Sequence, residues 1–403
     1  MTFPFLFRSF AVKKLTMEYN EKICICTLGR IFGYEPRKAL ELIKAAGSAG
    51  AIFDLSREEL SKLTGPYSDF NSRICRKELD ITAQELERLE KRGCRYLEIS
   101  DPHFPEMLKE CEDPPLGLYI RSDSPVESLF DDSPYIAIVG TRDISLYGRE
   151  WCRKIVAALS KAKNKPVIVS GLAIGTDIAA HQAALEGGLR TIGVLPTGID
   201  DVYPRRHEYD ADRISRAAGS ALVTDYPPGT KAIAINFLRR NRIIAGLSGA
   251  TILIESKAQG GGMITARLAA SYNREVYALP GRVDDIRSAG CNRLIQKKLA
   301  EPITDLGTLV RSLGLGESSY RRKDSLSEEV CSLYESSMPA DELSLIVRIV
   351  KHIRANRGAC CEDIAAAVNR PFSVISAYLT MLESDGLICT DLLGRCSINV
   401  RIS

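Results

Sequence analysis

Glycine and small hydroxyl residues follow several apolar runs of this sequence, in a pattern typical of phosphate-binding loops. Glycine lets a backbone approach a phosphate closely, and the free N–H groups at the start of a following helix attract anions. Because each run precedes a helix-length segment, we expect these loops to hold phosphates. The loop residues selected in this way are Gly140, Thr141, Ser170, Gly171, Gly175, Thr176, Gly261 and Gly262.

Arginine is the second part of the pattern. One arginine ends the VGTR run, two more follow the Tyr203-Pro204 pair, and the FLRRNR run adds three together with an asparagine. Guanidinium groups bind phosphate oxygens with paired hydrogen bonds, so six that converge would hold several phosphates. We therefore predict that the ligand is the backbone of a nucleic acid. The polar side chains of this site are Arg142, Arg205, Arg206, Arg239, Arg240, Asn241 and Arg242.

Other kinds of chemistry have less support in the sequence. The first loop lacks the third glycine of a dinucleotide-binding fingerprint, and no Walker-type G-x-x-x-x-G-K-[ST] run occurs. His181 lies in a helical segment without a recognisable nucleophile or paired carboxylates, so we interpret it as a structural side chain with hydrogen-bond partners. Cys291 is interpreted as a buried thiol. We predict no catalysis, no metal and no cofactor.

The composition places few limits on partners. The 403 residues contain 54 basic and 51 acidic side chains, a net charge of +3, so a cationic site must be local. The twelve cysteines lack zinc or redox spacing, which favours reduced thiols in a cytoplasmic protein. No apolar stretch is long enough to span a membrane. Residues 1–16 lack the charge order of a secretion signal, so we expect a disordered extension with Met17 as an alternative start.

Alternating elements must position the phosphate-binding residues. From Tyr135 onward, apolar runs such as YIAIV and PVIVS alternate with helix-length segments, which predicts an α/β fold with an extended Rossmann-like, doubly wound parallel sheet. The loops of such a sheet meet at the carboxyl ends of its strands. We predict a helical N-terminal domain of the helix-hairpin-helix or sterile-alpha-motif kind, the sheet domain, a polar linker and a winged-helix-like domain. These parts span residues 1–85, 86–312, 313–340 and 341–403.

A series of short runs resembles the DNA-processing protein A family, also called DprA or Smf, in both content and order. The runs are VGTR, SGLAIGTDIAAH, GVLPTGIDDVYP, FLRRNRIIAGLS, ITARLAA, YALPG and AGCNRLI. The resemblance implies a homodimer that binds single-stranded DNA without cutting it and hands the strand to the RecA recombinase during DNA uptake and recombination. It also implies DNA contacts by Arg142, by Arg205 and by the signature formed by Arg240, Asn241 and Arg242.

The chain departs from that family at GGGMITA, where the family has a serine, and at Leu238, where a proline is common. The first change removes a hydroxyl contact to phosphate that loop amides can replace.

Two other functions stay open. One is a Rossmann-like enzyme that cleaves nucleoside monophosphates, although the glutamate-bearing glycine stretch of such enzymes is missing. The other is a duplex-binding factor acting through the winged helix, whose recognition segment FSVISAYLTMLESDG lacks basic residues.

Overall fold

The structure is a computed structural model of the chain and describes residues 19–65, 68–316, 330–331, 333–335, 338–356, 358–391 and 394–398. Contacts divide the chain into two units, Met1–Ser318 and Ser319–Ser403. The expected N-terminal extension and most of the expected linker lie outside the described residues. The N-terminal helices, called the helical segment below, belong to the same unit as the sheet. The boundary expected near residue 86 therefore falls inside this unit, and the domain boundaries stay predictions.

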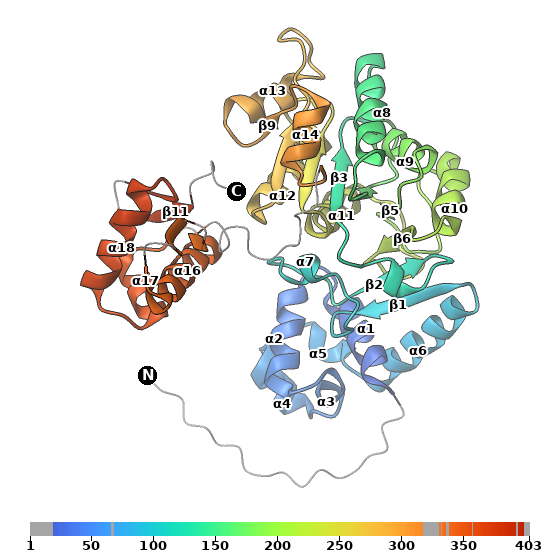
Figure 1. Cartoon of the computed structure of the whole chain (residues 1–403). Helices are drawn as coiled ribbons and strands as arrows, with labels where there is room; N and C mark the ends of the chain where they lie inside the picture. The colour runs from blue at the N-terminus through green and yellow to red at the C-terminus, as the bar shows by residue number, and fades with distance from the viewer. Residues whose placement is uncertain are drawn as a thin grey trace. The chain divides into compact units, whose positions relative to one another are not determined.

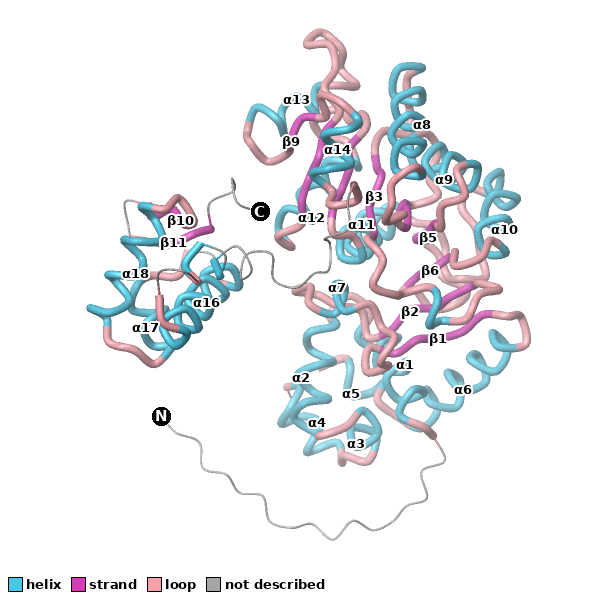
Figure 2. Tube along the Cα trace, viewed as in Figure 1, coloured by secondary structure: helices cyan, strands magenta, loops and turns pink. Residues whose placement is uncertain are grey.

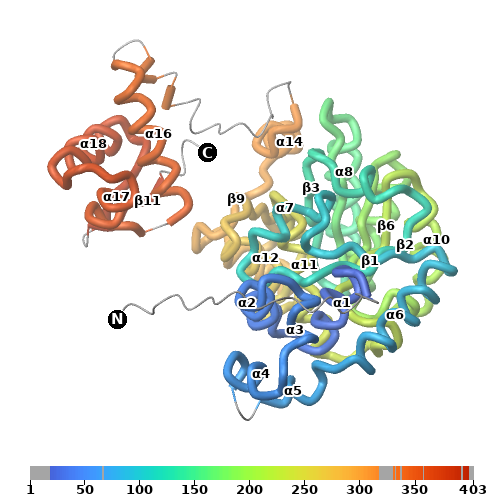
Figure 3. Tube along the Cα trace, turned by 90° about the horizontal axis from the view of Figure 1, so that it is seen from below, coloured from blue at the N-terminus to red at the C-terminus, as the bar shows by residue number. Residues whose placement is uncertain are grey.

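Short helices form the beginning of the first unit (Figure 1). Asn20 caps the first helix by accepting a hydrogen bond from the Ile23 amide, and Ser56 with Glu59 forms a capping box on the fourth. The first and last of these helices lie against the first strand of the sheet (Figure 3). The helices are α1 (Glu21–Phe32), α2 (Pro36–Ala46), α3 (Ala49–Phe53), α4 (Arg57–Thr64), α5 (Phe70–Arg73) and α6 (Arg76–Glu90).

A nine-stranded sheet with the order β1-β2-β6-β5-β4-β3-β7-β8-β9 forms the centre of the unit. The seven strands from β6 to β9 in this order are parallel, and β1 and β2 extend the β6 side as antiparallel strands. The α/β fold with a doubly wound parallel sheet is thereby confirmed. The strands are β1 (Cys94–Glu98), β2 (Gly117–Arg121), β3 (Tyr135–Val139), β4 (Val167–Ser170), β5 (Thr191–Val194), β6 (Ala221–Thr224), β7 (Ala250–Leu253), β8 (Glu275–Ala278) and β9 (Glu301–Pro302).

The strand order reverses between β3 and β7. From β3 the chain runs outward through β4, β5 and β6, and it then returns to β7 beside β3 before continuing through β8 and β9. In open α/β sheets, ligands bind at the carboxyl ends of the strands where the order reverses in this way. The loops after β3 and β7 therefore lie where a ligand is expected.

Helices cover both faces of the parallel sheet (Figure 2). Along β3, Ile136 and Ile138 join a core with α8, α9 and α14, whereas Ala137 and Val139 join the opposite core with α11, α12 and α13. Burial on both faces explains why this strand is apolar at every position. The helices are α7 (Glu106–Lys109), α8 (Leu146–Ser160), α9 (Thr176–Glu186), α10 (Glu208–Arg216), α11 (Ala234–Leu247), α12 (Gly261–Ser271), α13 (Ala289–Gln296) and α14 (Leu306–Ser312).

The second unit has its own apolar core, which includes the fully buried side chains of Ile346, Ile349 and Leu382. Its elements are α16 (Ala340–Ala355), α17 (Cys361–Val368), α18 (Phe372–Ser384) and the antiparallel pair β10 (Ile388–Thr390) and β11 (Cys396–Ile398). Helices followed by a strand pair are the order expected from the sequence, while the winged-helix assignment stays a prediction. None of the helices in the described ranges combines the length and apolar character that crossing a membrane requires.

Candidate nucleic-acid interface

Arg142 is exposed directly after β3, at the reversal of strand order. Its guanidinium carbon lies 4.8 Å from the centroid of the Phe237 ring, at the start of α11. The Phe237 ring meets the Tyr203 ring edge-on, with 5.4 Å between centroids, and Tyr203 is 44% exposed. Within the described ranges no acidic side chain forms an ion pair with Arg142. These three residues, the Arg142 cluster, thus place an unpaired cation beside exposed aromatic surface.

Two further cations follow the Tyr203 ring along the chain. Arg205 and Arg206 begin the short 3-10 turn Arg205–His207, and both are exposed. From the sequence we selected arginines, an asparagine, glycines and small hydroxyl residues, and we missed the aromatic members of the site. The available signal was the position of Tyr203 and Phe237, each of which lies within two residues of an expected arginine.

Arg240 requires a correction, because it was expected to bind phosphate and is instead 3% exposed. Its Nη1 donates hydrogen bonds to the carbonyl oxygens of Gly171, at 2.6 Å, and of Val194. These carbonyls lie at the carboxyl ends of β4 and β5. Burial lowers the pKa of the Arg240 guanidinium to about 10, against the opposing effect of the nearby Asp177 carboxylate. Arg240 therefore ties two strand ends together inside the protein.

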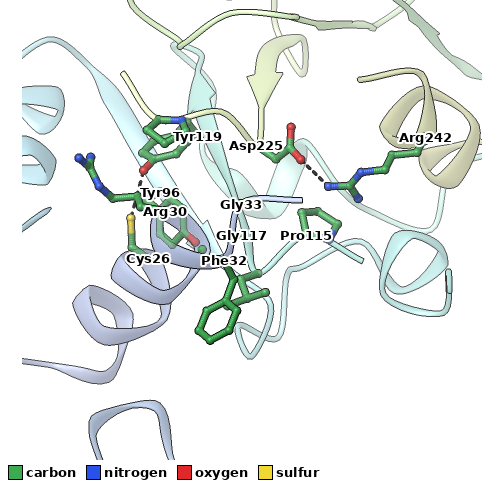
Figure 4. A pocket seen from close by; sticks show the side chains of 13 residues that line it. Cys26, Arg30, Phe32, Gly33, Tyr96, Pro115, Gly117, Tyr119, Asp225 and Arg242 are labelled. Carbon is green, nitrogen blue, oxygen red and sulfur yellow. Dashed lines mark hydrogen bonds and ion pairs between the residues drawn. The ribbon is translucent and has the colours of Figure 1, made fainter. Parts of the chain in front are cut away.

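Arg242 and Asn241 require the same correction, since each is only 8% exposed. The Arg242 guanidinium pairs with the Asp225 carboxylate, as Figure 4 shows, and donates a hydrogen bond to the backbone carbonyl of Asp113. Paired in this way, it has little capacity left for a phosphate. The six expected guanidinium groups therefore do not converge on one ligand. Four of them remain at least partly exposed, namely Arg142, Arg205, Arg206 and Arg239.

The glycine-rich loop between β4 and α9 encloses a carboxylate of the protein itself. Asp177 is 8% exposed near the start of α9. Burial raises the pKa of this carboxyl, while Arg240 and the amides of Ala173 and Gly171 act in the opposite direction. The amides expected to face a phosphate are thus directed toward Asp177. This corrects the expectation that Gly171 contributes a phosphate-binding amide.

The hydroxyl residues of the same region also point inward. Ser170 is fully buried and donates a hydrogen bond to the carbonyl oxygen of Ile138 at 2.6 Å. Thr176, also fully buried, donates to the carbonyl oxygen of Thr141 at 3.2 Å. The first bond joins β4 to β3, and the second joins the start of α9 to the loop after β3, so the phosphate contacts expected of Ser170 and Thr176 are corrected as well. Thr141 itself is partly exposed beside Arg142.

Close packing between loops accounts for most of the expected glycines. A Cβ on Gly140 would lie 2.4 Å from the Thr176 hydroxyl oxygen, and Gly175 has a φ of +89° with its Cβ position 2.3 Å from the Thr141 carbonyl oxygen. A Cβ on Gly262 would lie 3.1 Å from the Cα of Gly140. These glycines therefore allow the loops to touch. Gly261 is different, because it is exposed and nothing lies within 4 Å of its Cβ position.

Glu255 occupies the anion position at the start of α8 and was missed by our sequence analysis. It follows β7 at the reversal of strand order and is 1% exposed. Its carboxylate accepts hydrogen bonds from the Ser145 amide at 2.9 Å and from the Ser145 hydroxyl at 2.5 Å. Ser145 is the N-cap residue of α8, where the helix dipole favours a negative charge. The sequence signal was an acidic residue directly after the apolar run of β7.

His181 is fully buried on α9. The Thr191 hydroxyl donates its hydrogen to the carbonyl oxygen of Ile168, so it must accept from His181 Nδ1 at 2.8 Å. The expected hydrogen-bond partner is therefore present at Nδ1, while no partner for Nε2 meets the hydrogen-bond geometry within the described part of the chain. Burial lowers the pKa of His181 to about 3. Cys291 is confirmed as a buried thiol, and burial raises its pKa to about 12.

A small cavity lies between α1 and the β1–β2 end of the sheet (Figure 4). Cys26, Tyr119 and Asp225 are among its lining residues, and the Cys26 sulfur lies 3.2 Å from the Tyr119 hydroxyl. Its volume of about 20 Å³ has room for one water molecule and excludes a nucleotide. The helical segment is therefore joined closely to the sheet at this point.

The fold and the exposed cations define a Rossmann-like α/β protein with a basic, aromatic surface at the carboxyl edge of its sheet. Residues 95–314 match the family model described as DNA recombination-mediator protein A. Because the match covers more than half of the 403 residues, the chain belongs to this family, whose role lies in DNA processing and recombination.

Individual relatives agree with this assignment. The chain is 39% identical to the protein Smf of Synechocystis over 231 residues, which are 57% of each chain. It is 38% identical to the DNA processing protein DprA of Streptococcus pneumoniae over 199 residues, 49% of this chain and 67% of the relative. The X-ray structure of the latter protein superposes with a TM-score of 0.62 at 29% identity, covering 72% of this chain and 97% of the other. The match to the Synechocystis protein thus spans little more than half of that relative's length.

Proposed function

We propose that this protein binds single-stranded DNA at the carboxyl edge of its sheet and acts as a recombination mediator. The Arg142 cluster carries the proposal, because an unpaired guanidinium there lies over Phe237 beside the exposed Tyr203 ring. A guanidinium binds phosphate, and aromatic rings stack with unpaired bases, which contributes roughly 1–3 kcal/mol per base. The bases of a duplex are already stacked, so single strands are favoured.

The alternative function, cleavage of nucleoside monophosphates, requires a free anion position in the loops of the sheet. Glu255 fills that position at the start of α8, and Asp177 fills the loop before α9. A nucleotide phosphate would meet a like charge at either place. His181, the histidine of this region, is fully buried on α9 and therefore out of reach of a bound nucleotide. These contacts support a binding protein rather than a nucleotide-cleaving enzyme.

Membership of the family supports three broader proposals. The first is that the bound strand is handed to the RecA recombinase during natural transformation and recombination. The second is that the protein works as a homodimer, and the third is that it acts in the cytoplasm. These three proposals concern the whole protein and rest on the family, whereas the Arg142 cluster supports only the proposed binding of the strand.

Fluorescence anisotropy with labelled single strands, duplexes of equal length and free nucleotides tests the proposal. We expect Arg142→Ala to weaken single-strand binding roughly tenfold to a hundredfold, because a hydrogen bond to a charged group contributes about 1.5–3 kcal/mol. The slope of log affinity against log salt should become shallower by about 0.7. Arg142→Lys should recover part of the loss, since an ammonium lacks the planar fork.

Arg153→Ala is the matched control, because Arg153 is also exposed but lies on α8 and is not part of the Arg142 cluster. Its binding should equal that of the wild type, and the melting temperature should be unchanged in every variant. The proposal would be refuted if the wild type bound duplex as tightly as single strands or more tightly. It would also be refuted if folded Arg142→Ala protein kept the affinity and the salt slope of the wild type.

A further inference from the structure

A second pair of ring and guanidinium lies where the helical segment meets α11. The guanidinium carbon of Arg239 is 3.3 Å from the centroid of the Tyr34 ring, which belongs to the turn between α1 and α2. The Tyr34 hydroxyl donates a hydrogen bond to Asn236 Oδ1 at 3.0 Å, and its ring meets Tyr226 edge-on at 5.9 Å. Contacts with three residues of the sheet region thus fix this ring.

Both members of the pair are accessible. Tyr34 is 45% exposed, and Arg239 is partly exposed without an ion pair to any acidic residue in the described ranges. A guanidinium that stacks on a ring keeps the N–H groups of its edge free for oxygen acceptors. The pair of Tyr34 and Arg239 therefore offers the same chemistry as the pair of Phe237 and Arg142.

Exposed aliphatic side chains lie on α11 between the two pairs. Ile235 and Leu238 are 42% and 43% exposed on the first turns of the helix. Phe237 and Arg239 are two positions apart, so they leave the helix on nearly opposite sides. The two pairs are thus separated by about one helix diameter, roughly 10–12 Å. A strand of several nucleotides can contact both of them.

We propose that Tyr34 and Arg239 form a second contact point for single-stranded DNA, so that the helical segment is part of the binding surface. This inference rests on the proposed function and extends it across α11. Arg239 contacts a phosphate, and Tyr34 is a positioning residue that holds the guanidinium in place. The ligand is a nucleic-acid strand because the aliphatic surface is flanked on both sides by cations that no described carboxylate neutralises.

The dependence of binding on strand length tests the inference with the full chain. We expect Arg239→Ala and Tyr34→Ala to weaken binding of an oligothymidine of about 16 nucleotides roughly tenfold, and to leave one of about 4 nucleotides unaffected. Tyr34→Phe keeps the stacking ring and should restore the wild-type affinity. Arg142→Ala should weaken binding of both lengths. Arg239→Ala is informative even if Tyr34→Ala disturbs the helices, because the Arg239 side chain is partly exposed.

Tyr19→Ala is the matched control, since Tyr19 also belongs to the helical segment and also has an arginine over its ring. The guanidinium carbon of Arg76 lies 5.8 Å from the centroid of the Tyr19 ring. The Tyr19→Ala protein should bind both lengths as the wild type does. The inference would be overturned if folded Arg239→Ala protein bound the long strand as the wild type does while Arg142→Ala bound it more weakly. That result would leave the proposed function intact. Unchanged binding by both variants would remove the proposed function as well.

Discussion

Arg142 and Arg240 lie near the same sheet edge, but the first side chain is exposed and the second is buried. Arg142 is exposed, so its guanidinium stays hydrated and can exchange water for phosphate at little cost. Arg240 is 3% exposed, and its two backbone acceptors already replace water. Removing a buried charge from such contacts leaves carbonyl groups unsatisfied. We therefore expect a substitution at Arg240 to act on folding first, and one at Arg142 to act on the proposed binding of DNA.

The sequence carried a signal that separates these two arginines. Arg240 is spaced three, four and seven positions before Ile243, Ile244 and Leu247, which is the pattern of one helix face. Those three apolar residues are buried, so Arg240 shares the buried face of α11. The residue type led to the prediction of a phosphate contact, whereas the helical spacing, which was not considered, indicates burial. The partner carbonyl of Gly171 could not be predicted, because it comes from a loop 69 residues earlier in the chain.

His181 predicts how stability depends on pH. Its pKa is about 3 in the folded protein against an ordinary value of 6.5, so between these values only the unfolded chain binds a proton at this position. The stabilisation present above pH 6.5 is therefore lost as the pH falls, by up to about 1.4 kcal/mol per pH unit. His181→Gln should lose this slope, as measured by urea unfolding at pH 7 and pH 5. His103→Gln, at an exposed position, should keep it; identical slopes in His181→Gln and wild type would contradict the assignment.

The elements were easier to predict than the site. The run YIAIV coincides with β3, because burial on both faces requires five apolar residues in succession. The antiparallel pairing of β1 with β2, and of β2 with β6, was not predicted. Nothing in a five-residue strand specifies a partner that lies about a hundred residues away, as β6 does from β2.

The contact between Glu255 and the start of α8 makes a prediction for that element. Glu255→Gln keeps the side-chain shape and removes the charge that the helix dipole and the Ser145 amide favour. We expect a loss of about 1 kcal/mol in the free energy of unfolding, measured by urea denaturation. Glu150→Gln on the same helix is the control, because the exposed pair with Lys154 contributes little. Equal losses in the two variants would argue against a special role for Glu255.

At the scale of the whole molecule, the two units have separate apolar cores. We expect a chain that ends at Ser318 to fold cooperatively and to bind single strands with the affinity of the full protein, because every residue of the Arg142 cluster lies in the first unit. Calorimetry and anisotropy check the two statements. The fragment 319–403 alone should bind no single strand. A truncated chain that melts normally and has lost its binding would place the site in the second unit.

The stacking of Arg142 on Phe237 has a consequence for the kinetics of capture. Immobilising a long side chain on association costs about 0.5–1.5 kcal/mol in lost conformational freedom. Here the ring restricts the guanidinium before any strand arrives, so part of this entropy is lost during folding instead. Among related complexes, differences in affinity come mostly from the dissociation rate. Under the proposed function we therefore expect the preorganised cation to prolong the residence time of the strand, which is the interval in which the proposed recombinase partner would receive it.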